Sequence, residues 1–376
     1  MDFIDTYENL PFVFSGNVST LELHDIDTGD AADLPYVDFT VELMDFVPGH
    51  PIPVLEHKFS LPAVESGIVL DIREIFSGFS PLLVPGTRSN LKTVTIRAAL
   101  NEEYAAWSHN VILGECTAYD EERLMNNHKW WTKRPQVSRT YIHGREELSF
   151  FMKSSEKAKV CAVLYSCMNP PVTLQIVELI NSGRPGKPPY NIIYNIDCSY
   201  SGILALAEEN GFNDEFLAYD IFIEGNEDDA QRFIIKDDNA VSEFRFRNSL
   251  GLYDYIYATG SAAENIEHDT KTFINGRKET ELANDSRHLF KTNTGYLRSH
   301  DETALWREFL MSDERYILDD GEWREVIVDE TDNECKSMEL GEMSFNWHFA
   351  EHRPSGMPIR HELKPYILKC NGISEL

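Results

Sequence analysis

Hydrophobic and polar residues alternate with a period of two in several stretches of the chain. The clearest stretches are residues 37–43, 94–98, 244–247 and 343–349. A period of two places one row of side chains on a core and the other in water, which is typical of a half-buried β-strand. Two further runs, 159–166 and 172–179, are apolar on both sides and predict buried strands.

Short polar turns separate these strands. Asp27-Thr28-Gly29-Asp30, residues 224–229 and Asp319-Asp320-Gly321 have the composition of hairpin tips. Strands joined in this way pair antiparallel, and the chain shows no regular alternation of strands with long helices. The sequence therefore predicts a mainly β protein, built from several antiparallel β-sandwich modules with a few short helices.

Three short helices are expected. Residues 71–79 carry apolar side chains at helical spacing, and residues 203–210 end just before a glycine. The strongest signal covers 301–311, because Ser299 and Glu302 fit a capping box. In that motif the serine side chain accepts from the Glu302 amide, and the glutamate reaches back to the start of the helix.

Changes in composition divide the chain into modules. With 376 residues, of which 42% are hydrophobic, it is long enough for two or three domains with cores of their own. The expected order is a β-sandwich module over 1–115, a linker over 116–134, a second β-sandwich module over 135–247, a β-rich module with one helix over 248–350, and a C-terminal tail over 351–376.

Charge and cysteine usage restrict the partners. The net charge of -29 repels phosphate backbones, so we expect no nucleic-acid partner. The segment MDFIDTYENL lacks the basic and apolar regions of an ordinary signal peptide, and no apolar run is long enough to span a membrane. The six cysteines are scattered, which predicts free thiols in a chain without a secretory signal; three disulfides are the alternative.

Residues 348–352 match the His-x-x-Glu-His pattern of inverted zinc peptidases. That chemistry needs both histidines on one face of a helix. Here His348 closes an alternating strand, and Arg353-Pro354 follows the second histidine, which discourages a helix. The pattern therefore predicts the end of a strand followed by a loop, without a zinc site.

Two other motifs are incomplete. Asp25, Asp27 and Asp30 resemble the start of a calcium loop, but the twelfth position is Tyr36 where an EF-hand needs glutamate. We interpret the segment as a turn, with a weak surface cation site as the alternative. Residues 183–187 contain a Gly-Lys pair but lack the other positions of a phosphate loop. We expect no enzyme activity, no cofactor and no bound metal.

A pair of tryptophans stands beside basic residues in the expected linker. Exposed aromatic rings near cationic groups bind sugars or partner proteins. We expect an interaction surface at Trp130, Trp131 and Arg134. The alternative is that one tryptophan anchors the linker between two domains.

The most patterned part of the chain lies between residues 244 and 349. Its landmarks are an aromatic strand at 244–247, an Asn-x-x-Gly-x-x-Asp turn from Asn248 to Asp254, a second strand that ends at Thr259-Gly260, and a late apolar segment at 316–328. This part resembles uncharacterised proteins of phages and prophages of gut Bacteroidetes. It departs from them in having Glu325 where proline is common.

The resemblance implies a virion structural protein, commonly of the tail. We expect a tail or baseplate component that forms a homo-oligomeric ring and binds other virion proteins. Such a protein is synthesised and assembled in the cytoplasm of the bacterial host. The alternatives are a carbohydrate- or receptor-binding module, with or without a cation, and a hydrolase with a scattered site.

Overall fold

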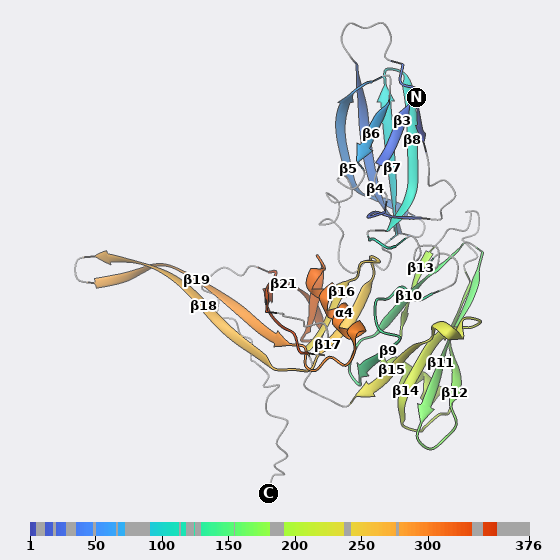
Figure 1. Ribbon diagram of the computed structural model, residues 1–376, viewed down its shortest axis with the longest axis vertical. Coiled ribbons are helices and arrows are strands. Elements are labelled where there is room, and N and C mark those ends of the chain that lie inside the picture. The colour runs from blue at the N-terminus through green and yellow to red at the C-terminus, as the bar shows by residue number, and fades with distance from the viewer. Residues whose placement is uncertain are drawn as a thin grey trace. The chain divides into compact units, whose positions relative to one another are not determined.

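Strands dominate the computed structural model of the chain (Figure 1), which confirms the prediction of a mainly β protein. The structure describes residues 1–4, 12–17, 20–27, 35–47, 50–64, 67–71, 91–112, 114–117, 124, 129–153, 155–180, 192–236, 242–275, 278–332 and 341–351. They form two compact units. Unit 1 holds residues 1–132, 146–234 and 248–252, and unit 2 holds residues 133–145, 235–247 and 253–376.

Unit 1 begins with a β-sandwich. Its larger sheet has the order β2-β8-β7-β4-β5, with bounds Val13–Phe14, Glu103–Ile112, Leu91–Leu100, Tyr36–Val47 and His50–Pro62. The smaller sheet has the order β1-β3-β6, with bounds Asp2–Ile4, Thr20–His24 and Ile68–Asp71. Phe39 and Val41 of the larger sheet share one core with Leu23 and Leu70 of the smaller sheet. The alternation over 37–43 therefore marks the buried face, as predicted.

The rest of unit 1 contains four strands in the order β12-β11-β14-β15, a two-stranded sheet β10-β13, and helix α3. Their bounds are Val172–Ile180, Lys157–Ser166, Phe216–Ile223, Gln231–Lys236, Glu147–Met152, Ile192–Asp197 and Tyr200–Glu209. The Ser199 hydroxyl accepts from the Gly202 amide at 3.3 Å and so caps α3. The helix ends before Gly211, whose φ of 79° favours glycine.

An aromatic cluster joins the sandwich to the rest of unit 1. Phe12 and Phe14 come from the start of the sandwich, and Trp131 and Phe151 come from the later part. The ring centroid of Phe12 lies 5.2 Å from that of Trp131 and 4.9 Å from that of Phe151. The two parts of unit 1 therefore share apolar side chains and form one core at this junction.

Unit 2 contains a seven-stranded antiparallel sheet and the helix α4. The sheet order is β17-β16-β20-β21-β22-β19-β18, with bounds Tyr253–Ala258, Ser242–Arg247, Arg315–Asp319, Glu322–Asp332, Ser344–Phe349, Lys278–Asn293 and Ala262–Asn275. Helix α4 (His300–Met311) packs Leu305, Trp306 and Phe309 against Phe244 and Phe345 of the sheet. These side chains form the core of the unit.

The start of α4 confirms the predicted cap with one difference. The Ser299 hydroxyl accepts from the Glu302 amide at 3.1 Å, as a capping serine does. The Glu302 carboxylate reaches back to the amide of Arg298, at 2.7 Å. The glutamate therefore accepts from the amide of Arg298, whereas in a capping box it would accept from the amide of the capping Ser299.

The predicted turn at Asp319-Asp320-Gly321 is also confirmed. It joins β20 to β21, and φ is 49° at Asp320 and 86° at Gly321. Positive φ at two successive residues suits the right-handed twist of a tight hairpin.

The compact units differ from the contiguous modules expected from composition. β16 ends at Arg247 and belongs to the sheet of unit 2, while residues 248–252 belong to unit 1. Backbone pairing of β16 with β20, far along the chain, decides this membership, and composition carries no signal of such pairing. Asp71, the expected start of the helix over 71–79, is instead the last residue of β6. Residues 72–79, the loop over 181–190, most of the linker and residues 352–376 lie outside the described residues.

Within the described ranges, no helix combines the length and apolar character that crossing a membrane requires.

Candidate functional site

The sheet of unit 2 continues at one end as a two-stranded arm (Figure 1). β18 and β19 pair from Ala262↔Thr292 to Asn275↔Lys278, whereas β22 pairs with β19 only at Phe290–Asn293. We call residues 265–275 and 278–289 the arm. β18 is the end strand of the sheet, so the outer edge of the arm carries backbone groups that pair with no described strand.

The described residues of β18 are exposed, although the side chain of Glu264, which pairs with His288, is only 23% exposed. Ala262, Ala263, Glu264 and Asn265 are four successive exposed residues at the base of the strand. Near the tip, the apolar side chain of Ile274 is 75% exposed. A two-stranded ribbon without a covering layer is only marginally stable in water, so the arm has the features of a surface that is covered in an assembly.

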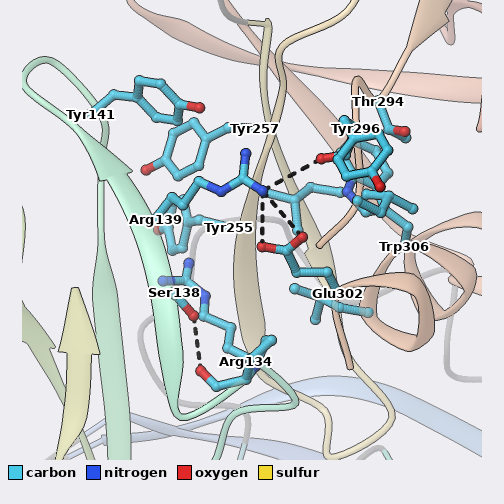
Figure 2. Close-up of a pocket in the computed structure, with 14 residues that line it drawn as sticks. Arg134, Ser138, Arg139, Tyr141, Tyr255, Tyr257, Thr294, Tyr296, Glu302 and Trp306 are labelled. Carbon is cyan, nitrogen blue, oxygen red and sulfur yellow. Dashed lines mark hydrogen bonds and ion pairs between the residues drawn. The ribbon is translucent and has the colours of Figure 1, made fainter. Parts of the chain in front are cut away.

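A pocket lies inside unit 2, between β9 (Val137–Tyr141), β17, the segment 294–297 and α4. It encloses about 60 Å³. Figure 2 shows Tyr141 and Tyr257 side by side on one wall and Trp306 of α4 on the other. Leu297, Leu305 and Trp306 are buried, whereas Tyr296 is 60% exposed at the rim. The pocket is thus mostly apolar and aromatic, with a few polar groups.

Arg134 lines the pocket and forms a buried ion pair. Its Nε lies 3.6 Å from Oδ1 of Asp254, and the two side chains are 2% and 1% exposed. The backbone amide of Lys133 donates to the other carboxylate oxygen of Asp254, at 2.9 Å. The Arg134 guanidinium also lies over the ring of Tyr255. Pairing and ring contact compensate the cost of removing both charges from water.

Arg139 reaches across the pocket to α4. Its Nη2 lies 3.3 Å and 3.4 Å from the two carboxylate oxygens of Glu302, and 3.4 Å from the carbonyl oxygen of Tyr296. Figure 2 shows these contacts converging on one end of the guanidinium. The buried Nε of Arg139 has no hydrogen-bond partner within the described part of the chain.

The face of the unit 2 sheet that points away from α4 carries Arg245 among aromatic rings. The guanidinium of Arg245 lies 4.9 Å from the ring centroid of Tyr253, 4.6 Å from that of Tyr316 and 4.7 Å from that of Trp323. Glu314 accepts hydrogen bonds from both tyrosine hydroxyls. Burial, followed by the nearby Glu314 carboxylate, raises the pKa of Tyr253. Burial, Tyr253 and Glu314 together raise the pKa of Tyr316.

These raised pKa values predict an alkaline loss of stability. The tyrosines stay protonated in the folded chain but ionise near their ordinary pKa of 10.0 when unfolded. The folded state then binds more protons, so the free energy of unfolding is unaffected below that pH and falls above it. The expected slope is about 1.4 kcal/mol per pH unit for each tyrosine. Urea unfolding at several pH values between about 8 and 11 measures it.

Tyr253→Phe and Tyr36→Phe are the matched variants for this prediction. Tyr253→Phe should make the alkaline slope shallower, because it removes one of the two hydroxyls. Tyr36 is 63% exposed, so its replacement should leave the slope unchanged. An identical slope in all three proteins would show that the Glu314 cluster does not control the alkaline loss.

The structure places the predicted interaction surface in the interior. The exposed fractions are 8% for Trp130, 1% for Trp131 and 7% for Arg134. Trp130 donates its indole N–H to the carbonyl of Ile221 at 3.2 Å, and Trp131 belongs to the aromatic cluster of unit 1. Burying the large apolar surface of these rings in the core is more favourable than leaving them exposed for a partner to bind. The expectation of an exposed surface at these residues is therefore corrected.

The described residues of the motif candidates lie outside helices. His348 is on β22, where its Nδ1 lies 2.7 Å from Oδ2 of Asp329, and His352 is outside the described residues. Asp25 and Asp27 are described, whereas Asp30 is not. Among the described side chains, no group of three or more His, Cys, Asp or Glu could hold a metal ion.

Thiol reactivity should differ strongly among the cysteines. Of the four described ones, Cys161 and Cys198 are buried, Cys116 is partly buried and Cys167 is exposed. Burial raises the pKa of Cys161, which lowers its thiolate fraction. We expect native alkylation near pH 8 to label Cys167 before Cys161 and Cys198, as peptide mass spectrometry can measure. Labelling of all three at one rate would contradict the burial described here.

No protein-family model matches the chain, and a search of curated proteins finds no match either. The arm and the pocket are therefore the features that point to a function. Sequence reasoning missed both. The pair Asn275-Gly276 between two strand-like segments was a usable hairpin signal for the arm. The Arg139–Glu302 pair had no such signal, because its members are far apart in sequence.

Proposed function

We propose that this chain is a structural subunit of a bacteriophage particle, a component of the tail or baseplate. It assembles with copies of itself into a ring and binds other virion proteins. It acts by binding rather than by catalysis, and it is synthesised and assembled in the bacterial host cytoplasm. The arm is the observation that carries this proposal.

The arm supports assembly because the rest of its own chain contributes little strand pairing to it. Beyond Phe290 its two strands pair only with each other among the described strands. Asn265 and Thr272 of the arm are exposed, and Ile274 leaves an apolar side chain in water. A neighbouring subunit would cover this surface and complete the hydrogen bonding of the outer edge.

The remaining architecture supports a role as a building block. Each unit has a core of its own, formed by the β-sandwich and the aromatic cluster in unit 1 and by the antiparallel sheet with α4 in unit 2. The resemblance of residues 244–349 to phage proteins covers the segment that contains the arm. The strongly negative charge of -29 also favours protein partners over nucleic acid.

Carbohydrate binding receives less support from the pocket. An engineered cavity that takes up benzene measures about 150 Å³. The pocket of unit 2 encloses about 60 Å³, so it is too small to enclose a sugar ring. A glycan array, probed with and without calcium, tests this alternative, and specific binding would favour it.

Two observations on the same protein test the proposal. Mass spectrometry of phage particles purified from the encoding host should find the chain as a stoichiometric component. Electron microscopy of the purified protein should show rings of uniform diameter. A chain that is absent from particles and monomeric at all concentrations would overturn the proposal.

A further inference from the structure

We propose that Arg145 and Arg245, held against the ring of Trp323 in unit 2, form an anion site that binds carboxylates of a second copy of the chain. The inference rests on the proposed self-assembly and names a surface through which one subunit holds the next. Three observations carry it: two cationic groups on one ring, contacts that leave both groups without a described carboxylate, and the place of the site on the sheet.

Two guanidinium groups lie against the indole of Trp323. The Cζ atom of Arg245 lies 4.7 Å from the ring centroid, and that of Arg145 lies 5.9 Å from it. Both are within the roughly 6 Å over which a cation and an aromatic ring attract each other. Arg245 comes from β16, Trp323 from β21 and Arg145 from the segment between β9 and β10. Two positive charges therefore converge at one point of a chain whose net charge is -29.

Arg145 is exposed, yet it is anchored on three sides. Its Nη2 donates to the carbonyl of Gly321 at 3.0 Å. Its backbone amide donates to Oε1 of Glu243 at 2.9 Å, and its carbonyl accepts from the hydroxyl of Tyr257 at 2.9 Å. A side chain that is already held in place loses little conformational freedom when a ligand binds. The position of this guanidinium is therefore set before a partner arrives.

Arg245 is held by rings and keeps its terminal nitrogens accessible. Its guanidinium contacts the rings of Tyr253, Tyr316 and Trp323. Of its three side-chain nitrogens, only Nε is buried without a hydrogen bond, which leaves Nη1 and Nη2 at the surface. A stacked guanidinium presents its N–H donors at its edge, where a carboxylate binds them in one plane. The site thus offers donors for an anion rather than an open ring for a sugar.

The contacts of the two guanidinium groups differ from those of other arginines. Within the described part of the chain, they contact aromatic rings and one carbonyl, and neither forms an ion pair with a carboxylate. Nearby acids have other partners, because Glu314 accepts from two tyrosine hydroxyls and Asp319 pairs with Arg324. Elsewhere, ion pairs with carboxylates are formed by Arg97, Arg134, Arg139, Arg232, Arg247 and Arg324.

The charge of the chain favours carboxylates as the anions. In a ring of identical subunits, the group that meets this site comes from the same sequence, in which acidic residues outnumber basic ones by 63 to 34. Two subunits of charge -29 repel each other, and a local cationic site that faces carboxylates offsets part of this repulsion. Arginine beside tryptophan and tyrosine is also the composition that contributes most to protein interfaces.

The site and the arm lie toward opposite ends of the unit 2 sheet. In the order β17-β16-β20-β21-β22-β19-β18, Arg245 is on the second strand, and the last two strands form the arm. A subunit that binds one neighbour through the arm can therefore bind another through this site. Two different surfaces on one subunit make a head-to-tail contact, and such contacts close into rings when the rotation allows.

Association measurements provide the first test. Arg145→Glu should weaken self-association, measured by sedimentation equilibrium at low salt, by about tenfold or more, because it turns attraction for carboxylates into repulsion. Added sodium chloride should weaken the wild type and reduce this difference, because salt screens exposed charges. Arg307→Glu is the matched control, since Arg307 is an exposed arginine of α4 in the same unit.

Carbodiimide cross-linking provides the second test, because it joins an amine to a carboxylate that contacts it. In a mixture of isotope-labelled and unlabelled chains, the amine introduced by Arg145→Lys should form an amide with an aspartate or glutamate of another chain. Peptide mass spectrometry distinguishes links between chains from links within one chain. Arg307→Lys should give no link between chains at its own position.

The outcomes separate the two proposals. If the wild type forms oligomers and Arg145→Glu associates as well as Arg307→Glu, the anion site is overturned and self-assembly stands. A link from position 145 only to carboxylates of its own chain would overturn the site as well. A wild-type chain that stays monomeric would overturn both proposals.

A nucleic-acid arm tests for phosphate in place of carboxylate. A labelled single-stranded oligonucleotide should not bind the wild type. Binding that Arg145→Glu abolishes, with association unchanged, would assign the site to phosphate groups and overturn the inference. Circular dichroism and urea midpoints of the Arg145 variants should match the wild type, because this side chain is exposed.

Discussion

Replacement of Trp131 by alanine is expected to destabilise unit 1 by about 3–5 kcal/mol. The indole is 1% exposed, and its ring centroid lies 5.2 Å from that of Phe12 and 5.7 Å from that of Phe14. Its removal leaves a cavity at the junction between the sandwich and the rest of the unit. Unfolding in urea, followed by circular dichroism, measures the loss.

Tyr104→Ala is the control for this variant. Tyr104 belongs to the same unit but is 76% exposed, so its loss should change the free energy of unfolding by no more than about 0.5 kcal/mol. A cost below about 1 kcal/mol for Trp131→Ala would mean that the aromatic cluster does not hold unit 1 together.

Asp254→Ala is expected to cost unit 2 about 3–5 kcal/mol, because it leaves the Arg134 guanidinium buried without its counter-charge. The carboxylate is 1% exposed and also accepts from the Lys133 amide. Urea unfolding, followed by circular dichroism, measures the loss.

The double variant Arg134→Met with Asp254→Leu separates the effect of an uncompensated buried charge from the effect of lost side-chain packing. Replacing both partners removes the uncompensated charge, so much of the stability should return. Glu56→Gln is the exposed control, since the side chains of Glu56 and Lys58 are 52% and 68% exposed, and its cost should stay below about 1 kcal/mol. If Asp254→Ala costs no more than Glu56→Gln, the buried pair has no structural role.

Local features of the fold were predictable from the sequence. The alternation over 37–43 lies in β4, and that over 343–349 lies in β22 and the residue before it. The apolar run 159–166 is the largely buried β11, whereas the run 172–179, also predicted as a buried strand, is the end strand β12, where only Leu174 is buried. The cap at Ser299 and the turn at Asp320 depend on neighbouring residues alone. Periodicity and turn chemistry act over a few residues, so a sequence shows them directly.

Long-range pairing was not predictable in this way. β16 pairs with β20, and residues 248–252 between β16 and β17 belong to a different unit. The pocket likewise combines residues from 134–141, 255–257 and 294–306. No local pattern reports which distant segments meet, so the module borders and the site required the structure.

The tryptophans show how composition can mislead about exposure. Trp130 and Trp131 stand beside Lys133 in a polar stretch, which suggested a surface. In the structure the rings are buried in unit 1, with the indole N–H of Trp130 donating to a carbonyl. A polar neighbourhood in sequence says little about a large side chain that can turn toward a core.

Light scattering coupled to size-exclusion chromatography tests the central claim, assembly through the arm, most directly. The wild-type chain should elute as a single species with a mass that is a multiple of 43.1 kDa. A variant in which a short turn replaces residues 265–289 should keep the strand content of the rest of unit 2 and elute as a monomer. A wild-type monomer, or an oligomer that survives removal of the arm, would contradict the account.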